Sequence, residues 1–215
     1  MTIFNLPGLS AQSGDSHLDY RQVIGQRAYK IVAPLQLKDS SAFYRVQQMV
    51  VQQYIDLRDL DAHRESGVAD IKAALTDKEQ IQKKIAEADA KTEADRAALH
   101  KRYIQKLSHI LGKDQVDIIK NGMTYNVLPI TYKGYLEMIP RLTTEERKFI
   151  LDALTEAREH AMDAGSSEKK HAWFGKYKGR INNYLSARGY DMNKESKAWQ
   201  ERMKTNQNKK QQPKQ

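Results

Sequence analysis

The amino-acid sequence predicts an all-α protein with a compact helical body and a long, charged, antiparallel helical hairpin. Apolar residues recur at three- and four-residue steps along most of the chain, the spacing of one face of an amphipathic helix. The 215 residues include only 11 glycines and 5 prolines, too few for the many turns of a β-sandwich. One short stretch, residues 123–131, has irregular or strand-like chemistry, although Pro129 excludes a central strand there.

The composition excludes several classes of protein. Hydrophobic residues make up 40% of the chain and charged residues 29%, which is typical of a globular protein with a sizeable core. No apolar run approaches the roughly 18 to 20 residues of a membrane-spanning helix, so we predict no integral membrane association. The chain has no cysteine, which removes disulfides, thiolate metal ligands and cysteine nucleophiles.

The basic charge is concentrated at the C-terminus. Lys and Arg number 36 against 27 Asp and Glu, a formal charge of +9. The last fifteen residues, from Glu201, hold one acid and five basic residues, which is +4 of that excess. The rest of the chain is only mildly basic, so we predict no nucleic-acid partner. No apolar residue follows Met203, and residues 204–215 are expected to form a disordered tail.

The N-terminus is uncharged and partly apolar. Its first twelve residues end in Leu9-Ser10-Ala11-Gln12, a small-residue pattern like that before a signal-peptidase cut. We therefore interpret residues 1–14 as the end of a secretory signal peptide, although the positively charged start is missing, and expect a periplasmic or secreted protein. The alternative is a frayed terminus with a few docking side chains.

Residues 15–203 are expected to form one all-helical domain. Its first helix should run from Ser16 to Ala33 and end before Pro34. Asp39 or Ser40 can cap the long helix that opens the hairpin, expected over residues 40–111.

Two sites within that hairpin carry turn or break signals. Ser66-Gly67 indicates a break in the first helix, and Thr76-Asp77 is expected to hold the turn. Few large apolar groups occur between residues 64 and 100, so this part should stand partly in solvent.

The C-terminal body is expected over residues 112–203. Gly112 should end the hairpin, and short helices should follow over residues 113–121 and 132–139. Thr143 or Thr144 then starts a clear helix that ends at Ala164. Gly165-Ser166-Ser167 starts the next helix, which reaches Gly189, and a last short helix spans residues 194–203.

Two stretches of this body have a distinctive sequence: GMTYNVLPITYKGYLEMIPRLTTEERKFI and EAREHAMDAGSSEKKHAWFGKYKGRINNYLSARGYD. They resemble an uncharacterised family of secreted bacterial helical domains of unknown function. Earlier segments, RAYKIVAPLQLKD, RVQQMVVQQYIDLRDLDAHRE and LHKRYIQKLSHILGKDQVDIIKNGM, are similar to the same family, so the resemblance covers about residues 16–200. It implies secretion, helices and a sugar-binding role linked to polysaccharide use, with no catalytic residues to carry over.

The segment from His171 to Tyr184 is the richest in chemistry that suits a sugar. Aromatic faces can stack on the C–H faces of a pyranose, and amide, guanidinium or imidazole groups can bond to its hydroxyls. Here these candidates lie close together: His171, Trp173, Tyr177, Arg180, Asn182 and Asn183. The alternative is that Trp173 and Phe174 are core residues, because periodic aromatic side chains usually pack inward.

A second pair of candidates flanks the irregular segment. Tyr125 and Asn126 precede Pro129, and loops on a rigid scaffold often carry binding residues. The tyrosine could equally lie at the edge of the core, since this residue type is often half-buried.

Asp152, Glu156 and His160 follow one another at four-residue steps and could share a divalent metal. Ion pairing with neighbouring Lys or Arg is the alternative reading, and we predict no metal and no cofactor. The common catalytic motifs GxSxG, GxGxxG, HExxH and the P-loop are absent from the sequence.

The sequence therefore favours a non-catalytic protein that binds a saccharide or polysaccharide fragment. Two alternatives remain: a periplasmic adaptor or chaperone-like protein that binds a protein partner through the hairpin, and a polysaccharide-active hydrolase or lyase. An exposed apolar groove along the hairpin would favour the adaptor, and a pocket with two carboxylates would favour the hydrolase.

Overall fold

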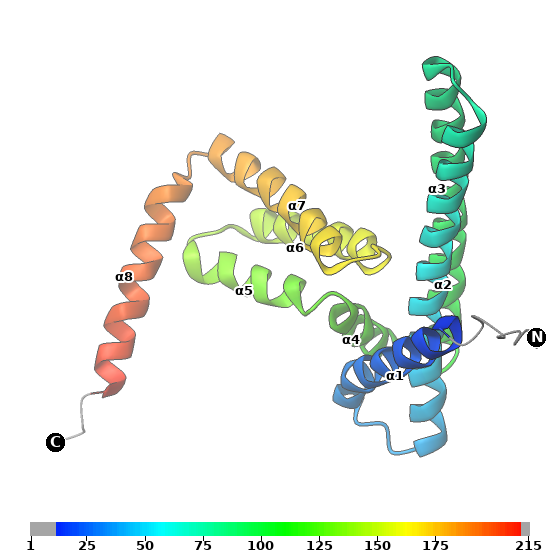
Figure 1. The fold of residues 1–215 in the computed structure, drawn as a ribbon. Coiled ribbons are helices and arrows are strands. Elements are labelled where there is room, and N and C mark those ends of the chain that lie inside the picture. Colours follow the sequence, from blue (N-terminus) through cyan, green and yellow to red (C-terminus); the bar gives the residue numbers. More distant parts are fainter. Residues whose placement is uncertain (1–11, 212–215) are drawn as a thin grey trace, which may run out of the picture. The chain divides into compact units, whose positions relative to one another are not determined.

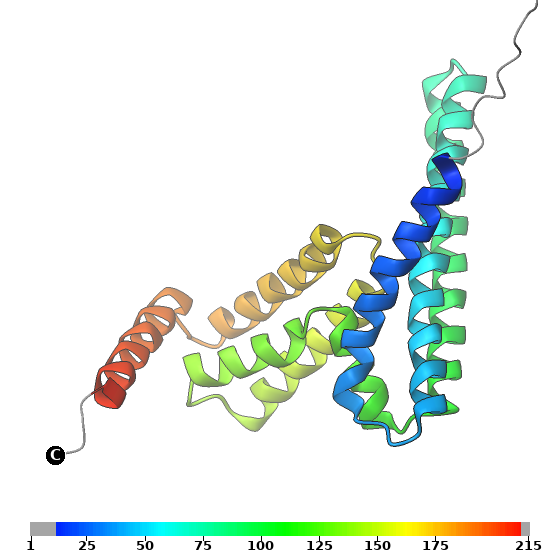
Figure 2. The same cartoon turned by 60° about the horizontal axis from the view of Figure 1, so that its bottom comes forward.

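The computed structural model describes residues 12–211, with the side chains of residues 20–205. Within that range the protein is all-α, with no strand, and the predicted fold class is confirmed (Figures 1 and 2). The elements in order are α1 (Gln12–Val32), η1 (Ala33–Leu35, a 3-10 turn), α2 (Ser40–Ala74), α3 (Lys78–Ser108), α4 (Lys113–Met123), α5 (Val127–Met138), α6 (Thr144–Met162), α7 (Ser167–Ala187) and α8 (Met192–Gln211).

The chain divides into two compact units. The N-terminal unit is Met1–Ile119 and the C-terminal unit is Lys120–Gln215, so the division falls inside α4. The border between the units lies close to the expected border between hairpin and body. The first helix, α1, belongs with the hairpin.

In the N-terminal unit, α1 lies antiparallel along the first half of α2. The Tyr20 hydroxyl donates to the backbone oxygen of Tyr54, and Arg58 lies over the Tyr20 ring. Nearer the connection, Tyr29 and Phe43 meet edge to face. A buried apolar layer holds the two helices together, because each methylene group that is buried away from water stabilises the fold by roughly 0.8 kcal/mol. It includes Ile24, Ala28, Ile31, Val32, Val46, Val50 and Val51.

Beyond this layer, α2 and α3 form the predicted antiparallel hairpin (Figure 1). Two ion pairs join the helices, Arg64 with Asp89 and Arg96 with Asp61, each at 2.7 Å. Between Leu57 and Tyr103 the only buried side chain is that of Thr92. Little apolar burial therefore holds this part of the hairpin together.

The C-terminal unit is built around the antiparallel pair α6 and α7. Their register is set by pairs that run from His160 with Trp173 at one end to Glu145 with Arg188 at the other. The core between these helices and α5 is apolar and includes Tyr135, Ile139, Ile150, Leu154, Ala157, Phe174, Ile181 and Leu185. Phe174 is only 1% exposed, which confirms its predicted place in the core.

Four of the helices begin at residues that the sequence predicts as helix starts. Asp39, Asp77 and Ser166 each accept a hydrogen bond from a backbone N–H of the first turn of α2, α3 and α7. At the start of α6, Thr143 and Glu146 form a reciprocal capping box. These bonds satisfy backbone donors that have no partner within the helix.

Two basic side chains donate hydrogen bonds to backbone oxygens at the C-terminal ends of helices. Lys170 is buried and donates to the backbone oxygens of Ala161 and Met162, at the end of α6. Arg202 of α8 donates to the backbone oxygens of Glu137 and Met138, at the end of α5. Cations at helix C-termini also interact favourably with the helix dipole.

Residues 123–131 were expected to be irregular or strand-like; they form no strand, and only residues 124–126 are irregular. Met123 ends α4, and α5 begins at Val127. Between them, Tyr125 and Asn126 have left-handed backbones, with φ of 57° and 56°. Pro129 lies in the first turn of α5, where the N–H that it lacks has no partner within the helix.

Two other boundaries differ from the predictions. Ser66-Gly67 does not break the helix, because α2 continues through these residues to Ala74. A single glycine destabilises a helix by only about 1 kcal/mol. Residues 204–211 are helical within α8, where the sequence predicts the start of a disordered tail over residues 204–215. Their lysines and glutamines are good helix formers. Of the predicted signal-peptide segment, residues 1–11 lie outside the described residues, and α1 begins at Gln12.

Candidate functional site

Aromatic and charged side chains line the surface where α6 and α7 meet, and we call this line the α6–α7 seam. Its first part, which we call the Trp173 end, comprises Glu156, His160, Trp173, Lys176, Tyr177 and Arg180. Its second part, which we call the Tyr184 end, comprises Glu145, Phe149, Tyr184 and Arg188. The antiparallel register of the two helices brings these side chains together from opposite directions along the sequence.

At the Trp173 end, a half-buried indole lies between the exposed side chains of His160 and Lys176 and the buried ring of Tyr177, which is 5% exposed. The His160 ring stacks on Trp173 with 4.4 Å between centroids and 14° between planes. Lys176 Nζ lies 5.0 Å from the indole centroid, and the Tyr177 ring lies 6.4 Å away. Since Lys176 is exposed and flexible, it can leave the indole when another group binds.

Glu156 is the carboxylate of this end. Arg180 donates to it at 3.1 Å, and Tyr177 is its second hydrogen-bond partner. The hydrogen bond from Tyr177, aided by the charges of Arg180 and His160, lowers the pKa of Glu156. Burial, and the same bond to Glu156, raise the pKa of Tyr177. At neutral pH this pair is thus a carboxylate that accepts and a phenol that donates.

The Tyr184 end is packed much more closely. The rings of Phe149 and Tyr184 are nearly parallel, with 3.6 Å between centroids. The Arg188 guanidinium lies 3.7 Å from the Tyr184 centroid and pairs with Glu145. These contacts cover the Tyr184 ring, so it offers little surface to a ligand.

The eight predicted site residues do not form one cluster. Trp173, Tyr177 and Arg180 share the α6 side of α7, as the contacts above show. His171 and Asn182 lie on the α5 side.

There, the His171 ring stacks on Tyr125 with 5.6 Å between centroids. Asn182 accepts a 2.7 Å hydrogen bond from the Tyr135 hydroxyl, so its amide supports the core. Asn183 is exposed and lies on the circumference of α7 between the residues on the α6 side and those on the α5 side.

Asn126 and Tyr125 are exposed between α4 and α5. Asn126 is the N-cap residue of α5, yet its side chain makes no capping hydrogen bond. Both residues have left-handed backbones, which cost of order 1 kcal/mol or more for residues other than glycine. With His171, they form a small polar and aromatic surface apart from the α6–α7 seam.

The two carboxylates considered for a metal form ion pairs, and the His160 ring stacks on Trp173. Asp152 pairs with Lys148, and Glu156 pairs with Arg180, which agrees with the ion-pairing alternative. Among the described residues, no group of three or more His, Asp and Glu side chains is arranged to hold a metal ion.

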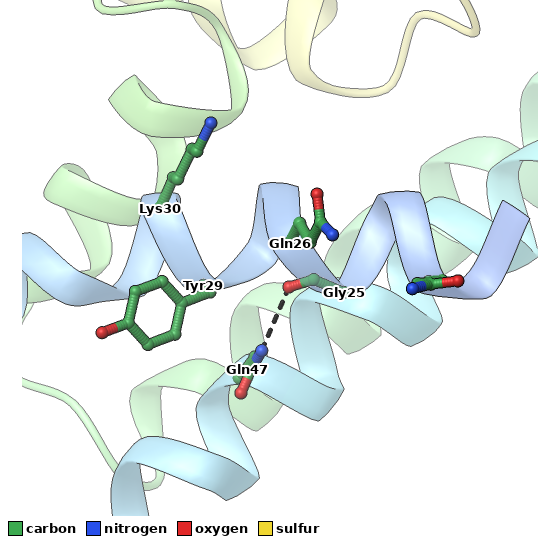
Figure 3. A pocket seen from close by; sticks show the side chains of 6 residues that line it. Gly25, Gln26, Tyr29, Lys30 and Gln47 are labelled. Carbon is green, nitrogen blue, oxygen red and sulfur yellow. Dashed lines mark hydrogen bonds between the residues drawn. The ribbon is translucent and has the colours of Figure 1, made fainter. Parts of the chain in front are cut away.

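A hollow in the N-terminal unit was not foreseen from the sequence. It lies between α1 and α2 and is lined by Gln22, Gly25, Gln26, Tyr29, Lys30 and Gln47 (Figure 3). Gln47 donates a 3.0 Å hydrogen bond to the backbone oxygen of Gly25. A signal for this surface is present in the sequence, because residues three and four positions apart share one face of a helix. Such a face here carries Gln22, Gln26 and Tyr29, with Gly25 among them.

The family described as "Protein of unknown function (DUF3826)" matches residues 21–205, most of the chain, so this protein belongs to that family. No curated protein matches the chain. No helix among the described residues combines the length and apolarity needed to cross a membrane.

Proposed function

We propose that this member of the DUF3826 family is a non-catalytic saccharide-binding protein, and that the Trp173 end of the α6–α7 seam contacts the sugar. The supporting observation is a half-buried indole with a displaceable lysine above it and a carboxylate–guanidinium pair beside it. Such a combination offers one apolar face and several directional polar groups.

The aromatic part of the proposal concerns the indole of Trp173. The C–H face of a pyranose is apolar, so it can replace Lys176 on an aromatic ring without leaving polar groups unpaired. The Tyr184 end lacks this possibility because its ring already contacts Phe149 and Arg188 at under 4 Å.

The polar part concerns Glu156 and Arg180. A sugar hydroxyl both donates and accepts, so neighbouring hydroxyls can bond to a carboxylate and a guanidinium at the same time. Both side chains are about half exposed, at 51% and 57%, and therefore remain available to a ligand. Such a site on an open surface fits a dissociation constant on the order of micromolar to millimolar.

The pKa of Glu156 is lowered, so this side chain is an ionised carboxylate at neutral pH. A lowered pKa does not suit the general acid of a glycosidase, which needs a raised pKa. The ionised form is the one that accepts hydrogen bonds from sugar hydroxyls.

The adaptor alternative lacks the surface that would favour it. Among the described side chains of α2 and α3, Tyr44 is the one large apolar group that is exposed, and a single side chain makes no groove. The hairpin surface is instead charged, and it carries helix-internal ion pairs such as Lys84 with Glu87.

The proposed location is periplasmic or secreted, and the proposed role is in polysaccharide use. The support is the uncharged N-terminal segment with its Leu9-Ser10-Ala11-Gln12 pattern. A polysaccharide fragment outside the cytoplasm is the ligand that this location and the Trp173 end would suit together.

The test compares two arginines on α7. After a glycan array identifies a ligand, isothermal titration should show that Arg180→Ala weakens its binding about tenfold, equivalent to ~1.4 kcal/mol. Arg188→Ala is the matched control, since Arg188 also pairs with an α6 glutamate and lies over an aromatic ring. It should change the affinity less than twofold. Equal effects of the two substitutions would refute the assignment of the Trp173 end.

A further inference from the structure

The hollow between α1 and α2 has features of a second ligand site, in the unit that does not contain the seam. Tyr29 is 56% exposed, and its edge-to-face contact with Phe43 holds the ring at 63° to its neighbour. The ring is thus fixed in orientation while more than half of the side chain stays accessible.

Planar amides accompany this ring. Gln47 is oriented by its bond to the Gly25 backbone oxygen, which uses the amide nitrogen and leaves Oε1 as an acceptor. Gln22 and Gln26 line the same hollow from α1. In the view of Figure 3, Tyr29 and Gln47 lie on one side of the α1 ribbon, and Lys30 extends away on the other. Among the residues whose side chains the structure describes, no carboxylate lines the hollow.

Gly25 creates part of the open space. A Cβ atom added at this position would meet no other atom within 4 Å, so no packing contact of the fold requires a glycine there. Glycine inside a helix is unfavourable relative to other residues. Gly25 lines the hollow, so a large side chain at this position would occupy part of its space.

We propose that this hollow binds one pyranose residue of a saccharide, with the sugar ring against Tyr29 and its hydroxyls bonded to the amides of Gln22 and Gln47. An amide donates and accepts at once, which suits a pair of neighbouring hydroxyls. The hydrogen bond that holds Gln47 in place reduces the entropy that this side chain loses on binding. This inference rests on the proposed saccharide-binding function and adds a second contact site, which would let one chain engage a polysaccharide at two places.

The test reads the two sites separately in the full chain. The probe is the oligosaccharide of three to six units that gives the strongest glycan-array signal, titrated into ¹⁵N-labelled protein. We expect the side-chain amide signals of Gln22 and Gln47 to shift, and the Trp173 indole signal to shift independently. Gly25→Leu should weaken the first response at least tenfold and leave the second unchanged.

Gly67→Leu is the matched control. Gly67 is also inside a helix of the N-terminal unit with no atom within 4 Å of an added Cβ, but it does not line the hollow. Both substitutions raise helix propensity, so both variants should melt no lower than the wild type. Tyr29→Ala, at a mostly exposed position, is the second variant and should weaken the same response as Gly25→Leu.

The possible outcomes separate the two proposals. A shift of the Trp173 indole without any response at Gln22 and Gln47 overturns the hollow as a site and leaves the proposed function standing. A response at the glutamines that survives both Gly25→Leu and Tyr29→Ala also overturns it. A response at the hollow alone supports this inference and refutes the assignment of the Trp173 end. A wild-type protein that binds no glycan overturns both.

Discussion

Replacing Asn182 by alanine should destabilise the C-terminal unit, whereas the same change at the neighbouring Asn183 should not. Asn182 accepts a 2.7 Å hydrogen bond from Tyr135, whose side chain is 6% exposed. Removing the acceptor leaves the buried hydroxyl without its partner, at a cost of about 1–3 kcal/mol. Asn183 is exposed and should tolerate the change.

The two substitutions share one offsetting effect. Alanine is a better helix former than asparagine by about 0.5 kcal/mol, and both positions lie inside α7. Asn182→Ala should therefore lower the free energy of unfolding by roughly 0.5–2.5 kcal/mol, and Asn183→Ala should raise it by up to about 0.5 kcal/mol. For a unit of this size, each kcal/mol corresponds to about 4–8 °C in melting temperature.

Tryptophan fluorescence during urea unfolding reports the stability of the C-terminal unit, which contains both substitutions. The chain has two tryptophans, Trp173 and Trp199, and both lie in the C-terminal unit. In a Tyr135→Phe background the donor is gone, so Asn182→Ala should no longer be destabilising. Equal stabilities of the Asn182→Ala and Asn183→Ala variants, or an unchanged cost in the Tyr135→Phe background, would refute the role of this hydrogen bond.

Three further predictions follow from the structure. Burial raises the pKa of Tyr135 to about 12 from 10.0, so the folded state holds this proton more tightly and stability should fall between pH 10 and pH 12. The loss should be on the order of 2–3 kcal/mol, and Tyr135→Phe should remove it. The prediction would be contradicted if the stability difference between the wild type and Tyr135→Phe did not change with pH. Amide hydrogen exchange should be faster between Leu57 and Tyr103 than in the helices of the apolar core, because only Thr92 is buried there, and slow exchange would show unrecognised stabilisation. Truncation after Met203 should leave the melting temperature unchanged, and a drop of several degrees would mean that residues 204–215 dock on the protein.

Local signals in the sequence were sufficient for the fold class and most helix starts. The caps Asp39, Asp77, Thr143 and Ser166 act on backbone groups within three residues, so their effect can be deduced from neighbouring residues alone. Pro129 shows the limit of such signals, because the same residue suits an edge strand and the first turn of a helix. Which of these forms depends on the left-handed backbone at Tyr125 and Asn126.

The site was harder to predict because it depends on which helices flank α7. Helical spacing correctly placed Phe174 in the core, and Trp173 and Tyr177 on a common stripe. It could not show that His171 and Asn182 would face α5, or that Asn182 would bond to a tyrosine 47 positions away. The partners Glu156 and His160 lie on another helix, where their spacing suited either a shared metal or ion pairs, and no metal was predicted.

The central claim is that this protein binds saccharide at the Trp173 end without cleaving it. A glycan array probed with the wild-type chain and with Arg180→Ala in parallel tests it most directly. The account predicts that the wild type retains at least one saccharide, that the array-bound glycan stays intact, and that Arg180→Ala loses most of the signal while its circular dichroism spectrum is unchanged. A wild-type chain that retains no saccharide, or an Arg180→Ala variant that binds as strongly as the wild type, would contradict it.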